Sequence, residues 1–563
     1  MMDIKVNPNE LIKADSHYLR GTLRESMADQ ASGALSPDDT QISKFHGFYQ
    51  QDDRDRRLDR RQQFLEPYYS FMLRARLPGG VCTPRQWLAI DAVGRELGNG
   101  SIRLTTRQTF QYHGILKRNL KPLIQRINRV MIDSIGGCGD VNRNVLCNPN
   151  PLSSTLHAEV YDWARRISEH LLPKTRAYHE IWLDGEPVAG GESEPVYGET
   201  YLPRKFKTAL AIPPHNDVDV YTNDLGFVAI AEGDELLGFN ILAGGGMGVT
   251  HDDYSTFPRL ADELGFIPPQ QTLAVAEAVV SVQRDFGDRT SRRHARLKYT
   301  IERMGLATFI TEVERRAGVR FKPSRRVRFT SQGDRYGWVE DERGRWHLTL
   351  YVENGRVADT PDASLMSGLR EIAGIHQGDF RITPGQNLIV AGVPEGQKAI
   401  IEGIARRHDL LAEGRSPTRL ASIACVALPT CPQAMAEAER YFPDLLETIE
   451  EIADRHGIDR QAIVMRMTGC PNGCARPYVA EIGLVGRGPG RYNLQLGGDG
   501  IGLRLNRLYR KNLNERELLR TLDELFRIYA GERLPQERFG DFAVRRGLVK
   551  PVIDPAEDYH EFP

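Results

Sequence analysis

Hydrophobic residues recur along the chain at helical spacing in two long segments. In HAEVYDWARRISEHLLP, Val160, Ala164 and Ile167 fall on one stripe, and in PDLLETIEEIADRHG, Leu445 and Ile449 do the same. A proline or a glycine follows each stripe at the point where a helix would end. The pattern therefore predicts two amphipathic helices, each with one buried face.

Short apolar runs with strand character alternate with these helices. KTALAIPP, GFVAIAEG, AIVMRM and EIGLVG are rich in β-branched and apolar residues, and SFMLRARLPGG reads as a strand followed by a helical run around 87–97. The strands and helices do not alternate regularly, so the sequence predicts an α+β fold with mixed sheets.

Two stretches of the chain are repeated. Ser101–Ile115 (SIRLTTRQTFQYHGI) has a counterpart in Gly378–Val393 (GDFRITPGQNLIVAGV) at an offset of 278, which aligns Arg103 with Arg381 and Thr105 with Thr383. A weaker match aligns FNILAGGGMG with YNLQLGGDGIG. Together they predict an A-B-A′-B′ chain whose modules pack about a pseudo-twofold axis, with a ligand where the modules meet.

Length and composition limit the possible classes of protein. The chain has 563 residues, of which 40% are hydrophobic and 26% charged, and its net charge is -1. We expect three or four domains. The absence of a basic excess argues against nucleic-acid binding as the default. The polar start predicts no signal peptide, and no apolar run approaches the length of a membrane span.

The N-terminal 70 residues show little periodicity and contain the charged run QQDDRDRRLDRRQQ (50–63). This run is typical of a solvated helix or surface arm. The alternative is a segment that docks on a partner subunit or wraps the core.

Four of the seven cysteines form two pairs with spacings C-x5-C and C-x3-C: Cys425, Cys431, Cys470 and Cys474. Four thiolates suit an iron-sulfur cluster, whereas structural zinc sites more often have shorter spacings at both ends. Zinc and unrelated buried cysteines remain the alternatives. Pro432 and the run after it predict that Cys431 starts a helix, whose dipole would favour a thiolate.

Three further cysteines stand alone: Cys82, Cys138 and Cys147. We expect them to be small buried side chains. Cysteine usage of this kind fits a reducing cytosol rather than a disulfide framework, so the sequence predicts a cytoplasmic protein.

Basic residues gather within apolar surroundings at several distant positions. On the strand patterns, Arg74 and Arg76 share one face, and Arg103, Thr105, Arg107, Thr109 and Gln111 share another. The remaining members are Arg143, Arg204, Lys205 and Lys207. Any one of them alone is an ordinary surface charge, but as a set they indicate an anion.

The glycine-rich runs GGGMG (244–248) and GRGPG (486–490) do not match a dinucleotide-binding fingerprint, and no Walker sequence is present. If the protein performs redox chemistry, electrons are expected from a partner.

The motifs ACVALPTC, MRMTGCPNGCAR, LRARLPGG, SIRLTTRQTFQYHG, DVNRNVLC and LPRKFKT resemble those of the sirohaem and iron-sulfur family of sulfite and nitrite reductases. The similarity extends over essentially the whole chain. More narrowly, KFHGFYQQDDRD and FGDFAVRRGLVKPVIDP resemble the branch formed by haemoprotein (beta) subunits of assimilatory, NADPH-dependent sulfite reductases.

The resemblance implies roles for particular residues. It implies a 4Fe-4S cluster on Cys425, Cys431, Cys470 and Cys474, with Cys474 also the axial ligand of sirohaem. It places around the sirohaem Arg103, Arg107, Gln111, His113, Arg204 and Asn472. It places on the substrate side Arg74, Arg143, Lys205 and Lys207. Sirohaem is rich in carboxylates, which gives the cationic set a physical reason.

The resemblance also implies an architecture. The expected parts are an N-terminal extension or partner-docking arm (1–70), one domain from duplicated ferredoxin-like half-modules (71–135 and 337–412), a first sirohaem and substrate domain (136–336), and a cluster-binding domain (413–563). The second copy has Gly385 and Ala391 where the first has Arg107 and His113. We therefore interpret the second copy as scaffold.

The activity implied is six-electron reduction of sulfite to sulfide in cysteine biosynthesis, with electrons from an NADPH-oxidising FAD/FMN flavoprotein subunit. Alternatives within the family are a ferredoxin-dependent sulfite reductase and a nitrite reductase. Outside it, the chain would be a zinc-stabilised protein that binds RNA or another partner, which the near-zero net charge disfavours. No nucleic-acid or membrane partner is expected.

Overall fold

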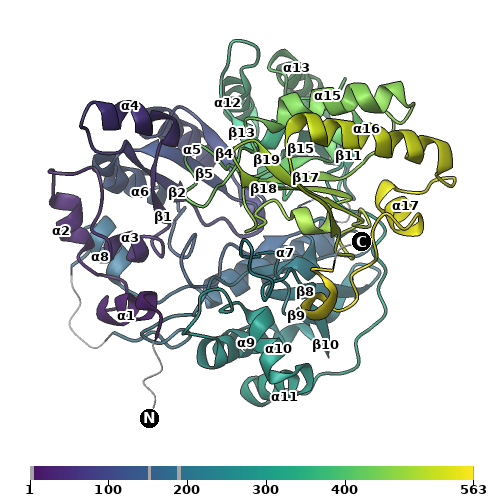
Figure 1. Cartoon of the computed structure of the whole chain (residues 1–563). Coiled ribbons are helices and arrows are strands. Elements are labelled where there is room, and N and C mark those ends of the chain that lie inside the picture. Colours follow the sequence, from purple (N-terminus) through teal and green to yellow (C-terminus); the bar gives the residue numbers. More distant parts are fainter. Residues whose placement is uncertain (1–5, 150–153, 187–191, 562–563) are drawn as a thin grey trace.

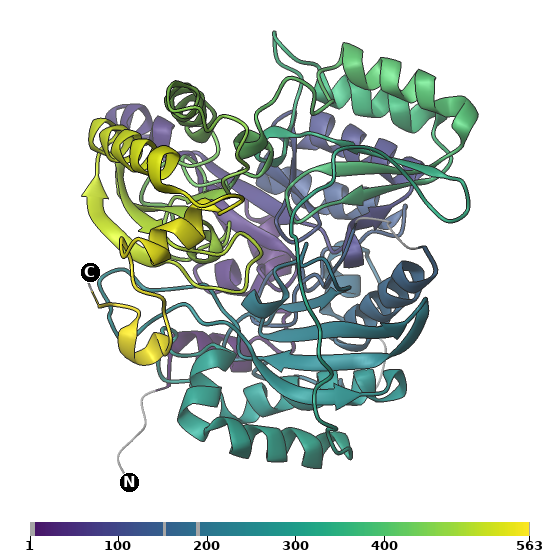
Figure 2. The same cartoon turned by 90° about the vertical axis from the view of Figure 1, so that its right-hand side faces the viewer.

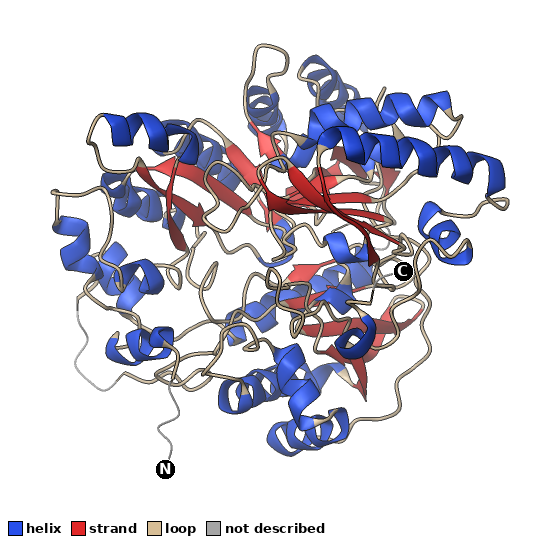
Figure 3. Cartoon of the chain, viewed as in Figure 1, coloured by secondary structure: helices blue, strands red, loops and turns tan. Residues whose placement is uncertain are grey.

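Four five-stranded sheets form the framework of the computed structural model, which describes residues 6–149, 154–186 and 192–561. Helices lie mostly on the outside and the sheets inside (Figure 3). The predicted α+β class with mixed sheets is confirmed. In the described part of the chain, no helix has both the length and the apolar character needed to cross a membrane.

Two of the sheets are fully antiparallel and have the same strand order. The first runs β1 (Phe48–Asp52), β2 (Tyr69–Arg74), β5 (Phe110–Ile115), β4 (Ile102–Leu104) and β13 (Arg356–Val357). The second runs β11 (Gly337–Glu340), β12 (Trp346–Leu350), β15 (Leu388–Val393), β14 (Asp379–Ile382) and β3 (Val81–Cys82). The stronger of the two sequence repeats thus folds as two equivalent half-modules.

Each half-module lends one edge strand to the other. β3 from the first copy pairs with β14, and β13 from the second pairs with β4. Gly80 and Gly355 sit at the two crossings with positive φ, and a Cβ at either position would lie 2.5 or 2.3 Å from a carbonyl oxygen of the other copy. Only glycine permits this approach, so the two copies form one unit.

The other two sheets are mixed and again equivalent. One runs β10 (Asp262–Ile267), β9 (Glu235–Ala243), β8 (Leu225–Glu232), β7 (Thr208–Ala211) and β6 (Leu146–Cys147). The other runs β20 (Arg507–Leu513), β19 (Arg491–Leu496), β18 (Ile482–Gly488), β17 (Met465–Thr468) and β16 (Ile423–Ala424). In both, the three strands at one end are parallel and the rest antiparallel. β9 and β19 carry the weaker repeat, so that prediction is confirmed.

Helices cover these sheets in sets (Figure 1). Around the half-modules lie α4 (Arg57–Gln62), α5 (Pro84–Leu97), α6 (Leu120–Asn128), α12 (Leu365–Ile375) and α13 (Lys398–Arg407). With the β6–β10 sheet lie α7 (Ser154–His170), α9 (Thr272–Phe286), α10 (Leu297–Met304) and α11 (Leu306–Ala317). With the β16–β20 sheet lie α14 (Pro417–Leu420), α15 (Phe442–Arg455), α16 (Glu515–Glu532), α17 (Phe539–Arg545) and α18 (Pro555–Asp558). An extended segment, 319–336, connects α11 with β11 along the outside (Figure 2).

The two predicted amphipathic helices are confirmed as α7 and α15. Val160, Ala164 and Ile167 are fully buried, and Leu445 and Ile449 are 2% and 1% exposed. The four predicted strand runs form β7, β8, β17 and β18. The helical run after SFMLRARLPGG is α5, which begins with a capping box formed by Thr83 and Gln86.

The alternating residues of Ser101–Ile115 predict one strand with a polar face, but the structure differs. The stretch forms the hairpin of β4 and β5, and the Thr105 amide donates to the Thr109 carbonyl at the turn (2.8 Å). Arg103 and Gln111 face each other across the hairpin rather than along one strand. The alternation alone does not reveal the left-handed turn residue Gln108 (φ 50°).

The described part of residues 1–70 packs on the core. Its helices are α1 (Pro8–Asp15), α2 (Leu23–Ala28) and α3 (Asp39–Ile42), and α8 (Ala177–Trp182) lies nearby in Figure 1. Leu19, Leu23 and Phe48 are fully buried. Within the charged run, α4 and the short 3-10 helix Arg54–Arg56 have no buried residue. The segment therefore wraps the core over most of its length.

Candidate active site

One cavity of about 580 Å³ collects every residue to which the family resemblance assigned a role in the site. It is lined by both half-modules, both mixed-sheet modules and the N-terminal segment. The predicted residues in its wall are Arg74, Arg103, Arg107, Gln111, His113, Arg143, Arg204, Lys205, Lys207, Cys425, Cys431, Cys470, Asn472 and Cys474. Residues more than 300 positions apart in the sequence thus meet where the modules join.

The four cysteines come from loops at one end of the β16–β20 sheet. Cys425 follows β16 and Cys470 follows β17, two neighbouring parallel strands whose carboxyl ends lie side by side. The Gly469 amide points at the Cys425 sulfur (3.4 Å), and the Asn472 side chain points at the Cys470 sulfur (3.6 Å). Burial and the other cysteines raise the pKa of the Cys425 thiol.

The cysteines are grouped without converging on one point. In the described residues, no three His, Cys, Asp or Glu side chains are placed to hold a single metal ion. A zinc site requires four ligands about 2.3 Å from one ion, whereas a cluster has its thiolates farther apart.

The predicted helix at Cys431 is wrong. Residues 431–441 form turns, and α15 begins only at Phe442. The amides that would start a helix are used elsewhere, because Met435 and Ala436 both donate to the Gly469 carbonyl (2.7 and 3.0 Å). This loop instead ties Cys431 to the segment that carries Cys470.

Three basic side chains project into the cavity without protein partners. In the described structure, the side chains of Arg204, Lys205 and Lys207 donate no hydrogen bond and form no ion pair. Burial and the charges around them lower the pKa of Lys205 to about 7 and that of Arg204 to about 10. The pKa of Lys207 also falls well below its ordinary value, through burial first and then Lys205. A set of mutually repelling cations indicates that an anion belongs here.

Arg74, Gln111 and His113 form a hydrogen-bonded chain in the wall of the same cavity. With its amide oriented to satisfy both neighbours, Gln111 accepts from Arg74 Nη2 and Nε (2.6 and 2.9 Å) and donates to His113 Nε2 (3.2 Å). Nε2 is then an acceptor, which places the proton of the neutral ring on Nδ1. That buried Nδ1 has no partner. Burial lowers the pKa of His113 well below its usual value, so the ring stays neutral.

The remaining arginines of the predicted set are held in different ways. Arg143 donates to the carbonyls of Gly139 and Gly137 (both 2.9 Å). Arg103 pairs with Glu439 (2.6 Å) and donates to the Ala424 carbonyl (2.9 Å), beside Cys425. Burial first, and then Arg476 and Arg143, lower the pKa of Arg107 to about 9, and the buried Nε of Arg107 has no partner.

Arg76 and the lone cysteines do not belong to the cavity wall. Arg76 points away and forms a two-pronged ion pair with Asp133 (2.5 and 2.9 Å). The expected anion for this arginine is therefore an aspartate of the chain itself. Cys82 and Cys147 are buried as expected, and Cys138 is buried and accepts a hydrogen bond from Arg74 Nη1 (3.1 Å).

Sequence reasoning missed several residues of the wall, chiefly from the N-terminal segment. Lys44 lies 5.5 Å from the ring of Tyr49, and burial lowers its pKa to about 8. Asp140 holds Arg292 in a two-pronged ion pair (2.8 and 3.1 Å). Arg476 also lines the cavity. The motif KFHGFYQQDDRD contains Lys44 and Tyr49 and was the available signal.

Two family models match the chain. The nitrite and sulphite reductase 4Fe-4S domain matches residues 162–321, and the nitrite/sulfite reductase ferredoxin-like half domain matches residues 65–130 and 339–406. The second match covers the two half-modules that exchange edge strands. The four cysteines lie outside both matched regions, so their assignment depends on the cavity and on whole-chain relatives.

Relatives match over the whole length. A protein of Thiocapsa roseopersicina named sulfite reductase (NADPH) hemoprotein beta-component is 68% identical over 561 residues, which cover 100% of each chain. A Shewanella oneidensis protein of the same name is 60% identical over 564 residues, with the same coverage. The solved structure of Mycobacterium tuberculosis NirA has the same fold, with a TM-score of 0.80, 24% identity and 96% of each chain covered.

Proposed function

Because the chain belongs to the family of nitrite and sulfite reductases, we propose that it reduces sulfite to sulfide as the haemoprotein component of an NADPH-dependent sulfite reductase. The observation that carries the proposal is the single cavity in which four cysteine thiols face a set of cations without partners. Thiolates suit an iron-sulfur cluster, and the cations suit both an anionic macrocycle and an anionic substrate.

The residues present fit sirohaem and a 4Fe-4S cluster. Two buried donors in the cavity, Arg107 Nε and His113 Nδ1, have no partner among the residues that the structure describes, as expected where a carboxylate-rich group binds. We propose that the sirohaem is held by Arg103, Arg107, Gln111, His113, Arg204, Asn472 and Cys474. We propose that the cluster is held by Cys425, Cys431, Cys470 and Cys474, with the Cys474 thiolate shared.

The bound cofactors supply the electrons and an iron atom that binds sulfite. Within this chain, Arg74 and Arg143 orient the oxyanion, because each guanidinium is fixed by carbonyls or by Gln111. Fixed cations neutralise the substrate and polarise its S–O bonds as oxygen leaves. Their hydrogen bonds hold them in place before substrate arrives, so little reorganisation is needed.

Lys205 and Lys207 are the proposed proton donors. A pKa of about 7 for Lys205 places its proton transfer at neutral pH, where a general acid is most effective. Bound sulfite raises that pKa and keeps the lysine charged until a proton is needed. His113 is neutral and donates through Nδ1, which suits a carboxylate contact better than acid catalysis.

We propose that an NADPH-oxidising flavoprotein delivers electrons near α4. Arg54, next to α4, donates to the carbonyls of Pro429 (3.3 Å), Ala434 (2.8 Å) and Cys431. Arg54 therefore joins the segment that leads into α4 to the cysteine loop, and the exposed arginines of α4 and the exposed side chains of Leu58 and Phe64 follow it in the chain. An acidic flavoprotein surface fits this basic and apolar patch.

We also propose a division of the chain into an N-terminal segment (1–70), a domain of two half-modules (71–135 and 337–412), a first mixed-sheet domain (136–336) and a cluster domain (413–563). Exchange of the edge strands β3 and β13 supports the joining of the two half-modules.

Purified holoprotein tests the activity directly. With a chemically reduced low-potential dye as donor, we expect sulfite-dependent oxidation of the dye and stoichiometric sulfide. With NADPH alone we expect none, and activity should appear when the flavoprotein is added. Turnover of nitrite with no turnover of sulfite would contradict the proposal, and NADPH oxidation by the chain alone would contradict the partner.

A further inference from the structure

An ion pair joins equivalent positions of the two mixed-sheet modules beside Cys474. β7 begins 257 positions before β17, and β8 begins 257 positions before β18. At the same offset, Asp219 is equivalent to Arg476. Both residues are left-handed (φ 46°, ψ 58° and φ 56°, ψ 50°), and each precedes a short 3-10 helix. The two backbones therefore have the same local shape, and only the side chains differ in charge.

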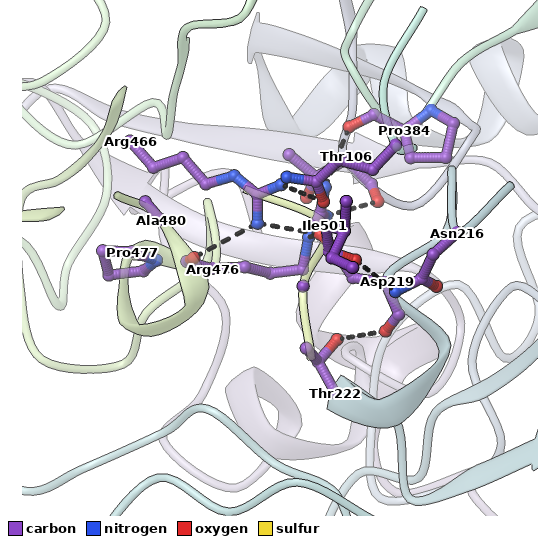
Figure 4. A network of polar contacts seen from close by, with 12 residues as sticks. Thr106, Asn216, Asp219, Thr222, Pro384, Arg466, Arg476, Pro477, Ala480 and Ile501 are labelled. Carbon is purple, nitrogen blue, oxygen red and sulfur yellow. Dashed lines mark hydrogen bonds and ion pairs between the residues drawn. The ribbon is translucent and has the colours of Figure 1, made fainter. Parts of the chain in front are cut away.

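The pair is buried and central (Figure 4). Arg476 Nε donates to Asp219 Oδ2 (2.5 Å), and Arg466 Nη1 donates to the same oxygen (2.8 Å). The side chain of Asp219 is 1% exposed, and those of Arg466 and Arg476 are 7% and 8% exposed. A single carboxylate thus compensates two buried guanidinium groups.

The other two nitrogens of Arg476 reach the half-modules. Nη1 donates to the Thr106 carbonyl (3.2 Å) and Nη2 to the Pro384 carbonyl (3.3 Å). Thr106 and Pro384 are themselves equivalent at the offset of 278. The Arg476 guanidinium therefore binds two carbonyls that are equivalent to each other. It also binds Asp219, which occupies the position equivalent to Arg476 in the other mixed-sheet module. These contacts place the guanidinium close to the pseudo-twofold axis of the molecule.

The network reaches both sides of the proposed cofactor site. The Thr106 hydroxyl donates to the Cys474 carbonyl (3.1 Å). On the other side, Asn223 donates to the Asp219 carbonyl (3.1 Å) and accepts from Arg107 Nη1 (2.6 Å). Cys474 and Arg107 are thus each connected to the same buried pair through two hydrogen bonds, by way of Thr106 and Asn223 respectively.

We propose that Asp219 and Arg476 are positioning residues that fix the Cys474 turn relative to Arg107, an inference that rests on the proposed function. If the two mixed-sheet modules were identical, the same residue of each would meet at the axis between them. The meeting of Asp219 with Arg476 therefore arose as the two modules diverged into a molecule with a single site. The arginine lies in the copy that carries the cysteines. If one thiolate serves both haem and cluster, the four modules must be positioned to within a fraction of an ångström of one another. The buried guanidinium of Arg476, with its three acceptors, supplies that constraint.

Three substitutions test the proposal in the holoprotein. Asp219→Asn removes the charge, Arg476→Lys keeps the charge but lacks the fork, and Thr106→Val removes only the bond to Cys474. Asp91→Asn is the matched control, because Asp91 is also 1% exposed and paired with two arginines, Arg95 and Arg370. Iron and sirohaem content, the visible and Mössbauer spectra, the haem midpoint potential and the unfolding temperature are measured for each.

We expect Asp219→Asn and Arg476→Lys to keep both cofactors but to show weakened magnetic coupling between haem and cluster, a shifted potential and sulfite turnover reduced at least ~10-fold. Thr106→Val should change the spectrum in the same direction by less. Asp91→Asn should lower the unfolding temperature and leave the spectra unchanged.

Unchanged coupling and potential in all three variants, with lower unfolding temperature alone, would overturn the proposal and make the pair a structural fastener. If Asp219→Asn fails to fold, Arg476→Lys and Thr106→Val decide by the same spectra. A wild-type protein without sirohaem would instead overturn the proposed function, so the two failures are distinguishable.

Discussion

Replacing Lys205 with Met removes a cation that destabilises the folded chain when no cofactor is bound. Burial and the neighbouring Arg204 lower its pKa from 10.5 to about 7. Because the folded pKa is the lower one, the unfolded chain binds more protons between these two values, and stability rises with pH across this window. Below pH 7 the whole penalty applies, and above pH 10.5 it vanishes.

The pKa difference sets the size of the effect. A fall of the pKa from 10.5 to about 7 is a difference of about 3.5, which at about 1.4 kcal/mol per unit gives a ceiling of about 5 kcal/mol. Lys205 lines a cavity that admits water, so about 2 kcal/mol is the expected penalty. For a domain of the size of the β6–β10 module, this corresponds to about 4–8 °C in unfolding temperature.

Thermal unfolding of cofactor-free protein from pH 6 to pH 10.5, in buffer without oxyanions, measures the penalty. We expect Lys205→Met to unfold at a higher temperature than wild type at pH 6, with the difference shrinking toward pH 10.5. The exposed Lys174→Met is the control and should show no such trend. A variant that is less stable at pH 6, or a difference independent of pH, would refute the electrostatic reasoning.

Three other substitutions test parts of the site. Cys474→Ser should abolish the coupling between haem and cluster and stop turnover, as seen in the Mössbauer spectrum and in sulfide output; full sulfite reduction would exclude a shared ligand. Lys207→Ala should retain both cofactors and lower sulfite turnover by about 10²-fold or more, as measured by steady-state kinetics; a protein that lacks sirohaem would make this lysine a cofactor anchor. Arg54→Gln should speed the loss of cluster iron to a chelator, since it frees the loop that holds Cys431, whereas the exposed Arg61→Gln should not; equal rates would remove Arg54 from the support of the cluster.

The local sequence pattern was sufficient to predict features that depend on a single helix, strand or motif. The stripes of α7 and α15 follow from spacing alone, and the duplication is visible because matching residues recur at one offset. The four cysteines also stood out, since paired thiols need no knowledge of the fold. The equivalence of β9 and β19 lay at the limit of what similarity in sequence reveals.

Long-range contacts explain what the sequence could not reveal. The loop after Cys431 does not form the predicted helix because the amides of Met435 and Ala436 donate to the Gly469 carbonyl, 34 and 33 positions away. Arg76 forms an ion pair with Asp133, 57 positions away. The segment that contains Lys44 packs against the core because β1, which follows it, pairs with β2. No local signal predicts such partners. The Asp219–Arg476 pair is likewise visible only once the two modules are superposed by their strands.

The visible absorption spectrum of the purified protein, with iron and labile sulfide determined on the same sample, tests the central claim most directly. The account predicts sirohaem bands together with the iron of one 4Fe-4S cluster and one haem, and a spectrum that changes on addition of sulfite to the reduced protein. A colourless protein that contains zinc would contradict it.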